Sequence, residues 1–338
     1  MKQSDHKFPL VSIIIPVFNG EKTIRECLKG VLSSNYKSVE IIVVDDGSID
    51  KTSEIVKNFG RVKLLTQTNS GSATAKNHGA KNAKGEFFYF LDSDVVVFED
   101  TISKFVETAN KFEVDMVVGA YSTRPMNDGF VHHYKALTDY VMYLPKKYRK
   151  EVRVNHLIGG GGEMFSKDSF LNLGGFNTTY KGASVEREEL FIRFRHAGYR
   201  SAANPIIVTR HYFPSFKGLI KNYIFRIYQT VKLLSQTGKK ATSFSYISLE
   251  KAIIAPLFAF LLVTTLLTAF LNLTPFLLSW ICTILFFILS REFIEVCYQH
   301  HGLKRTILLI GFHLMVCNVI FVSGAISKLL VTVQLRYY

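Results

Sequence analysis

The sequence predicts an α/β protein with a mostly parallel sheet in its N-terminal part and membrane-crossing helices in its C-terminal part. Over residues 10–110, short apolar runs alternate with helical patterns, which is typical of a parallel sheet with right-handed crossovers. A basic amphipathic stretch follows at residues 215–240. No charged residue occurs between Ala252 and Ser290, so this segment is long enough for two membrane spans.

The first elements of the sheet are predicted from largely continuous apolar runs, as expected for strands that are covered on both faces. The predicted strands are Val11–Val17, Glu40–Val44, Val62–Thr66 and Glu86–Leu91, and the helices between them are Glu21–Ser33, Asp50–Phe59 and Ser72–Ala83. Residues 111–214 are less regular. We expect them to complete the same domain, residues 1–214, with antiparallel additions and mobile loops.

The N-terminus resembles a signal peptide only loosely. Lys2, His6 and Lys7 precede the apolar stretch Pro9–Phe18, but no small-residue cleavage site follows. We therefore predict a first strand here, in a domain that stays in the cytoplasm.

Composition narrows the function classes. The chain has 338 residues, enough for about two domains, a formal net charge of +14 and a mean hydropathy of +0.17. No acidic residue lies between Leu190 and Leu249, whereas ten Lys and Arg residues do, and such a block attracts the phosphates of an anionic membrane or of a ligand. Nucleic acid is not expected as a partner, because this block runs into membrane sequence. The four cysteines lack CxxC spacing, so neither disulfides nor zinc are expected.

Residues 215–240 are predicted to form an amphipathic helix that lies at the membrane surface. Its apolar stripe comprises Phe216, Leu219, Ile220, Tyr223, Ile224, Ile227, Val231 and Leu234. Lys217, Lys221 and Lys232 lie largely off this stripe. A helix packed on the soluble core is the alternative that this pattern leaves open.

The region 252–338 is predicted to span the cell membrane several times, with spans at about 252–271, 275–290 and 306–327. Arg291, Lys304 and Arg305 fall between the second and third spans, whereas the turn at residues 272–275 carries no Lys or Arg. The positive-inside rule therefore places the N-terminal domain and the 291–305 loop in the cytoplasm.

Two acidic motifs follow predicted strands. Asp92-Ser93-Asp94 comes directly after Glu86–Leu91, and Asp45-Asp46 follows the second strand. Ligands of open α/β sheets collect at the carboxyl ends of such strands, and closely spaced carboxylates can hold a hard cation that binds a phosphate. Solvated turns or helix caps would use the same residue types.

The segment between these motifs, residues 69–79, opens a helix after a Gly/Ser loop and carries Lys76, which could reach a diphosphate. It is not a Walker A loop. The first strand is not followed by GxGxxG, which argues against a dinucleotide-dependent oxidoreductase.

Four motifs in this order and spacing resemble family 2 glycosyltransferases of the GT-A fold. They are VSIIIPVFN at residues 11–19, VVDDGS at 43–48, the segment 71–79 and GEFFYFLDSD at 85–94. The resemblance covers roughly residues 10–215 and implies a Rossmann-like sheet that binds a nucleotide-diphosphate sugar together with Mg²⁺ or Mn²⁺.

The resemblance also implies roles for single residues. Pro16 and Phe18 would lie beside the nucleotide, Asp46 would recognise the base, and Asp92 would contact both ribose and metal. Asp94 would be the principal metal ligand. The full set of residues expected to bind the nucleotide sugar is Pro16, Phe18, Asn19, Asp45, Asp46, Lys76, Asp92 and Ser93. Lys76 stands where the family usually has arginine, which keeps the charge but loses the bidentate fork.

The acceptor side departs from the family pattern. Ile158–Phe165 resembles its acceptor segment, with Glu163 where a small polar residue is usual. Residues 185–199 resemble the acidic catalytic motif, but the position of the usual base falls on Arg187, which cannot accept a proton. The expected base is then one of Glu186, Glu188 and Glu189, although acids in the first turn of any helix would look the same.

His211 resembles the histidine of a His-x-x-Pro segment that precedes the interfacial helix in membrane-bound members of the family. We expect it to contact the metal or the diphosphate, and a structural histidine is the alternative.

These parts predict an inverting glycosyltransferase that moves one sugar, with UDP as the first choice of nucleotide and GDP or TDP as further options. The expected acceptor is lipid-linked, in the assembly of cell-surface polysaccharide, glycolipid or protein glycan. Transfer to polyprenyl phosphate is an alternative, because that acceptor is already ionised. The chain lacks the Gln-x-x-Arg-Trp motif of processive synthases. Two other classes stay open, a nucleotidyltransferase and a non-catalytic membrane protein that binds a nucleotide sugar.

Overall fold

The computed structural model describes residues 8–156, 160–180, 185–237, 261, 263 and 276–336. The chain divides into two compact units. The first comprises residues up to Asn127 together with Lys147–Tyr212, and the second comprises Asp128–Lys146 together with the chain from Phe213 onward. We call them the sheet unit and the helical unit.

The sheet unit holds one nine-stranded sheet with the strand order β3-β2-β1-β4-β8-β6-β9-β5, in which β7 pairs with β9. The strands are β1 (Val11–Val17), β2 (Val39–Asp45), β3 (Val62–Thr66), β4 (Phe87–Phe90), β5 (Val95–Val97), β6 (Met116–Tyr121), β7 (Arg153–Val154), β8 (Glu163–Ser166) and β9 (Ser201–His211). Pairs within β1 to β4 and the β6–β9 pair are parallel, whereas β8 runs antiparallel to both β4 and β6. The predicted parallel sheet with antiparallel additions is thus confirmed.

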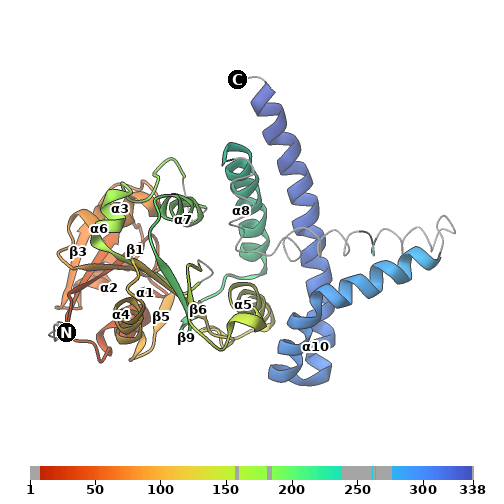
Figure 1. Cartoon of the computed structure of the whole chain (residues 1–338), viewed down its shortest axis with the longest axis horizontal. Coiled ribbons are helices and arrows are strands. Elements are labelled where there is room, and N and C mark those ends of the chain that lie inside the picture. Colours follow the sequence, from red (N-terminus) through yellow and green to blue (C-terminus); the bar gives the residue numbers. More distant parts are fainter. Residues whose placement is uncertain are drawn as a thin grey trace. The chain divides into compact units, whose positions relative to one another are not determined.

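Helices cover both faces of this sheet (Figure 1). They are α1 (Ile24–Leu32), α2 (Thr52–Lys57), α3 (Ser72–Lys81), α4 (Thr101–Phe112), α6 (Lys167–Asn172) and α7 (Glu186–His196). On one face the Phe165 ring of β8 packs against Phe170 of α6 and Phe194 of α7, with centroids 5.8 and 5.7 Å apart. On the other face Tyr89 of β4 packs against Phe105 of α4, at 4.8 Å. Phe88, the neighbour of Tyr89 in β4, packs on Phe170 of α6 at 5.8 Å, so alternate residues of one strand contact opposite helical layers.

Helix α1 begins later than the sequence predicts, at Ile24 instead of Glu21. The Glu21 N–H donates to Asp50 Oδ2 at 3.1 Å, and the Gly20 N–H donates to Thr52 Oγ1 at 2.8 Å. These bonds tie residues 20–21 to the start of α2, so the backbone there forms a turn instead of helix.

Helix α3 lies unusually close to the sheet. A Cβ atom added at Gly79 would lie 2.4 Å from Ile14 Cγ2 and 3.2 Å from Val44 Cγ2, and both of these side chains are fully buried. Only glycine therefore permits this approach, which sets the position of the whole helix relative to β1 and β2.

The helical unit contains α5 (Phe130–Tyr143), α8 (Phe216–Thr237) and α10 (Phe276–Arg336). Tyr134, Leu137 and Val141 of α5 share one buried cluster with Leu219 of α8 and with residues of α10. The sequence assigned residues 128–146 to the first domain, and the structure instead packs them with the helices, because the apolar side of α5 is buried in this cluster.

Two features of α8 bear on its predicted role. Leu219 and Tyr223 of the apolar stripe pack into the helical cluster, whereas Phe216 and Ile224 of the same stripe are exposed. Lys217, Lys221 and Arg226 are exposed as well. The helix thus shows a basic surface and divides its apolar residues between the cluster and the exterior, and residues 238–240 lie outside the described part.

The prediction of a loop at residues 291–305 is wrong. Residues 291–305 are helical except at Gly302, where φ is 70° and the helix breaks into two segments. Phe293, before the break, and Leu309, after it, belong to the same cluster, so the two segments fold back on each other. The charged Arg291 does not interrupt the first helical segment. It pairs with Glu295 one turn later, with 2.8 Å between Arg291 Nε and Glu295 Oε1.

Within the described residues, one helical stretch, Ile281–Val331, is long and apolar enough to cross a membrane. It includes the third predicted span and most of the second. The first predicted span, 252–271, lies outside the described residues except for Leu261 and Val263.

Replacing Gly79 by alanine should destabilise the sheet unit by about 1–3 kcal/mol, because the added methyl group overlaps two buried β-branched side chains. Thermal unfolding of the purified protein, followed by circular dichroism, would measure the loss. Gly60→Ala is the matched control, since a Cβ atom there meets nothing within 4 Å. Equal stability of the two variants would contradict the close-approach argument.

Candidate active site

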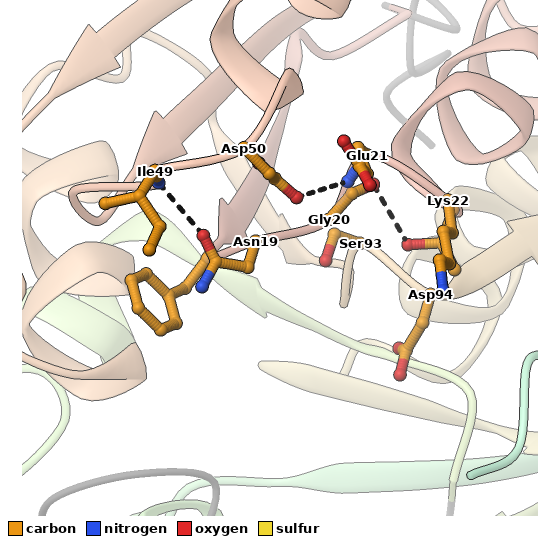
Figure 2. Close-up of a pocket in the computed structure, with 10 residues that line it drawn as sticks. Asn19, Gly20, Glu21, Lys22, Ile49, Asp50, Ser93 and Asp94 are labelled. Carbon is orange, nitrogen blue, oxygen red and sulfur yellow. Dashed lines mark hydrogen bonds between the residues drawn. The ribbon is translucent and has the colours of Figure 1, made fainter. Parts of the chain in front are cut away.

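A pocket of about 700 Å³ opens at the carboxyl ends of the central parallel strands. It is formed by the loop after β1, the loop after β2 and the residues after β4. The lining residues are Phe18, Asn19, Gly20, Glu21, Lys22, Thr23, Ile49, Asp50, Ser93 and Asp94. Figure 2 shows Asn19 beside Ile49, and it also labels Ser93 and Asp94, which follow β4 in the chain. The pocket therefore lies at the edge of the sheet where the sequence predicts a ligand.

Hydrogen bonds join the two loops that form one wall of this pocket. Asn19 adopts a φ of 52°, its N–H donates to Ser48 Oγ at 2.8 Å, and its Oδ1 accepts the Ile49 N–H at 3.0 Å (Figure 2). Phe18 and Ile49 remain 50% and 91% exposed. This arrangement gives the pocket two apolar side chains on a rigid backbone. Pro16, by contrast, is buried within β1 and does not line the pocket.

Asp45 and Asp46 are buried and hold the loops in place. Asp45 accepts the Ser48 N–H at 2.9 Å and the Ser53 hydroxyl. Asp46 accepts the Ser70 and Gly71 N–H groups and the Gln67 side-chain amide, each at 2.8 Å. The backbone N–H groups of Ser70 and Gly71, just before α3, are thus bonded to Asp46.

Lys76 is the buried cation of the site. Its side chain is 5% exposed, and its Nζ lies 3.5 Å from Asp92 Oδ1 and 3.7 Å from Glu186 Oε1. Burial alone would lower the pKa of this ammonium, but Asp92, Glu186 and Glu163 together hold the pKa above its usual value. Lys76 is therefore charged throughout the physiological pH range.

Asp94 lies next to His211, with 3.4 Å between Oδ1 and Nε2. Antiparallel pairing sets this proximity, because Val95 of β5 is in register with His211 of β9 and the Tyr212 N–H donates to the Asp94 carbonyl at 2.9 Å. No group of three or more His, Cys, Asp or Glu side chains in the described part of the chain is placed to hold a metal ion. The pair supplies a carboxylate oxygen and an imidazole nitrogen, which fit a divalent cation whose remaining ligands come from elsewhere.

The three predicted catalytic glutamates have different surroundings. Glu186, the first residue of α7, is buried beside Lys76. Glu188 Oε1 lies 3.3 Å from Arg187 Nη2. Glu189 forms a bidentate pair with Arg193, at 2.8 and 2.7 Å, and Arg193 also donates to the Gly175 carbonyl. The structure thus brings Glu186 to the Lys76 cluster and ties Glu189 to the 173–175 turn.

Glu163, which was not among the residues predicted for the site, belongs to the same charged group. It is 4% exposed, and burial raises the pKa of its carboxyl to about 7, with Lys76 and Arg187 opposing this shift and Asp92 and Glu186 adding to it. The departure from a small polar residue at this position was the available signal. Lys22, on the pocket lining, was also missed and lies in no motif.

Comparison with known proteins relates residues 12–174, most of which belong to the sheet unit, to a known family. Residues 12–174 match the family described as glycosyl transferase family 2. Glycosyltransferase GlyG of Streptococcus pneumoniae serotype 4 is 37% identical over 136 residues, which are 39% of this chain and 45% of GlyG. Glycosyltransferase GlyA of the same organism is 29% identical over 175 residues, 48% of this chain and 25% of GlyA. The matches thus span less than half the length of these relatives.

Two solved structures share the fold. The mannosyltransferase PcManGT of Pyrobaculum calidifontis, in complex with GDP-Man and Mn²⁺, aligns with 95% of this chain and 87% of its own, at a TM-score of 0.58 and 18% identity. Residues 1–349 of S. aureus TarS align with 97% of this chain and 91% of their own, at a TM-score of 0.50 and 17% identity. The sheet with its charged strand ends, the matched family and these shared folds agree: the sheet unit has a GT-A-like fold, and residues 12–174 are similar to the glycosyl transferase family 2 domain of transferase enzymes.

Proposed function

We propose that this protein transfers one sugar from a nucleotide-diphosphate sugar to a lipid-linked acceptor at the cytoplasmic face of the cell membrane. The observation that carries the proposal is the buried, permanently charged Lys76 beside Asp92, next to a pocket that ends in Ser93 and Asp94. A cation and a pair of metal-ligating side chains together suit the two negative charges of a leaving diphosphate.

The pocket supports a nucleotide as the bound part of the donor. Its volume, about 700 Å³, lies within the range of small-molecule sites, roughly 300–1,000 Å³. The exposed Phe18 ring offers a face on which a base can stack. PcManGT binds GDP-Man, which supports a nucleotide sugar here as well. We propose UDP as the first nucleotide to test and GDP or TDP as the next. In this proposal Asp46 acts on the base by shaping the loop that surrounds it.

Asp94 and His211 are the proposed ligands of Mg²⁺ or Mn²⁺, and Asp92 is proposed to contact the ribose and the metal. The Mn²⁺ in the PcManGT structure supports this choice of metal. Such an ion, when bound, would offset charge on the diphosphate as it leaves. Lys76 would add a second positive charge at the same group, and Glu186 would orient Lys76 through the 3.7 Å contact.

The proposed reaction is a single displacement. An acceptor oxygen attacks the anomeric carbon from the face opposite the diphosphate, so the configuration of the sugar is inverted. Because the acceptor attacks directly, no covalent sugar–enzyme adduct forms, and a trapped adduct would contradict the proposal.

The proposal of an acceptor in the membrane is based on the C-terminal half of the chain. The long apolar stretch of α10 and the basic exposed residues of α8 support attachment to an anionic membrane, and hence an acceptor in that membrane. One observation favours polyprenyl phosphate as the alternative acceptor. Arg187 stands where the family places a carboxylate, and a cation there suits an acceptor that is already ionised.

A donor screen tests the proposed function. The purified full chain in detergent, with Mn²⁺ and a membrane lipid extract, should release a nucleoside diphosphate from one of a panel of UDP-, GDP- and TDP-sugars and move a labelled sugar into the lipid phase. Release of pyrophosphate from a nucleoside triphosphate and a sugar phosphate would instead identify a nucleotidyltransferase.

Asp94→Ala should lower transfer by about 10²–10³-fold, because the cation loses its carboxylate ligand. Initial rates measured across a Mn²⁺ titration would show the loss as a higher Mn²⁺ requirement. Asp100→Ala is the control, since Asp100 pairs with Lys104 at 2.6 Å on the surface next to α4. Transfer by Asp94→Ala at the wild-type rate would leave the metal assignment without support.

Lys76→Met should lower transfer by about 10²-fold or more. The step that slows most should be the departure of the nucleoside diphosphate. Because the pKa of Lys76 is raised, the ammonium stays charged, and the wild-type rate should not fall between pH 7 and 9 through loss of this charge. Lys104→Met, which removes a surface lysine, is the matched control. An unchanged rate in Lys76→Met would contradict the assigned role.

A further inference from the structure

Glu163 occupies a position that the strand directions bring to the ligand edge. It is the first residue of β8, and β8 runs antiparallel to β4. The beginning of β8 therefore lies beside the carboxyl end of β4, where Asp92 and Asp94 follow. Glu163 is in register with Phe90 of β4 on one side and with Val118 of β6 on the other.

The register also determines which face of the sheet Glu163 occupies. Residues in register point to the same face, so the Glu163 side chain shares the face of Phe90. The Phe90 ring packs on Phe176 with centroids 5.0 Å apart, and Lys76 Nζ lies 5.1 Å from the centroid of Phe176. Glu163 therefore belongs to the face that carries Lys76 of α3 and Glu186 of α7.

The carboxylate of Glu163 differs from the other acids of the site in its surroundings. Phe90 and Val118, its neighbours across the sheet, are both apolar and buried. Among the described residues, none donates a hydrogen bond to this carboxylate. Residues 160–162, which precede it, are glycines, so no side chain of theirs covers it. A buried carboxyl without a hydrogen-bond donor is suited to accept a proton.

The position of the expected base lacks a carboxylate. Arg187 stands there, and Glu188 pairs with it. Glu189 is bound to Arg193, and Glu186 lies 3.7 Å from the Lys76 ammonium, which it is proposed to orient. A hydroxyl acceptor still has to lose its proton during transfer, so another acid has to receive it.

We infer that Glu163 is this general base, placed on β8 instead of at the start of α7, and that the acceptor group is a hydroxyl. This inference rests on the proposed glycosyl transfer. In the step, the acceptor oxygen forms a bond to the anomeric carbon while its proton moves to a Glu163 carboxylate oxygen. The bond between the anomeric carbon and the diphosphate oxygen breaks, the nucleoside diphosphate leaves with the electron pair, and Glu163 later gives the proton to water.

The charged groups around Glu163 set its titration. Lys76 of α3 and Arg187 of α7 favour the ionised form, whereas Asp92 after β4 and Glu186 of α7 oppose it, and Tyr89 of β4 also interacts with it. Burial is the largest influence, and the resulting pKa of about 7 suits a base that acts near neutral pH. The wild-type rate should therefore rise with pH up to about pH 7 and then level off.

The test compares Glu163→Gln with wild type over pH 5.5–8.5, using the donor found in the screen and the membrane lipid extract as acceptor. Glu163→Gln should transfer about 10²–10⁴-fold more slowly and should lose the acidic limb of the pH profile. Glu163→Asp should keep that limb and recover part of the rate. Glu186→Gln and Glu188→Gln should keep the limb even where their rates fall.

Two results would overturn the inference: an acidic limb that persists in Glu163→Gln, or one that disappears in Glu186→Gln or Glu188→Gln instead. Failure of the proposed function looks different, since the wild type would then release no nucleotide from any donor.

A measurement without substrate keeps the inference testable in that case. The raised pKa means that the folded protein holds a proton on Glu163 which the unfolded chain releases near pH 4.5. Between pH 4.5 and 7, wild-type stability should therefore fall relative to Glu163→Gln and stay lower above pH 7. Parallel unfolding midpoints from pH 5 to pH 8 would contradict the inference.

Discussion

The site depends on one physical constraint, the burial of the Lys76 ammonium at the carboxyl edge of the sheet. A buried cation is stable only beside carboxylates, and Asp92, Glu186 and Glu163 supply them from three different elements. Helix α3 carries Lys76 and can approach the sheet because Gly79 has no side chain against Ile14 and Val44. The close packing of α3 therefore positions the charge on which the proposed chemistry rests.

The sheet topology explains why acids from distant parts of the chain meet. Parallel strands place Asp92 and Asp94 at the carboxyl end of β4, and an antiparallel strand inserted beside β4 presents its first residue at the same edge. A second antiparallel pairing, between β5 and β9, brings His211 beside Asp94. The antiparallel additions are therefore part of the site as well as of the core.

Two departures from the expected family pattern fit together in the proposed reaction. Arg187 stands where the resemblance implies the usual base and favours ionisation of Glu163, and Glu163 stands where it implies a small polar residue. With Glu163 at the start of β8 in place of a carboxylate at the start of α7, an acidic side chain still lies at the same edge of the sheet. The boundary between the two units also does not follow the order of the chain. Helix α5 lies between two parts of the sheet unit in the sequence, but it packs with α8 and α10.

The sequence by itself determined the first four strands of the sheet and the three helices between them. Val11–Val17 and Val62–Thr66 were predicted with their observed bounds, and the acids after β2 and β4 were found, because apolar periodicity and the residues that end a strand are local properties. Only the tertiary structure decided which side chains meet. Strand register and helix packing bring Glu163 to the charged group of Lys76 and Glu186 and turn Asp46 toward residues 70–71. These contacts link residues far apart in the chain, so their geometry depends on how complete elements pack and leaves no mark on local sequence.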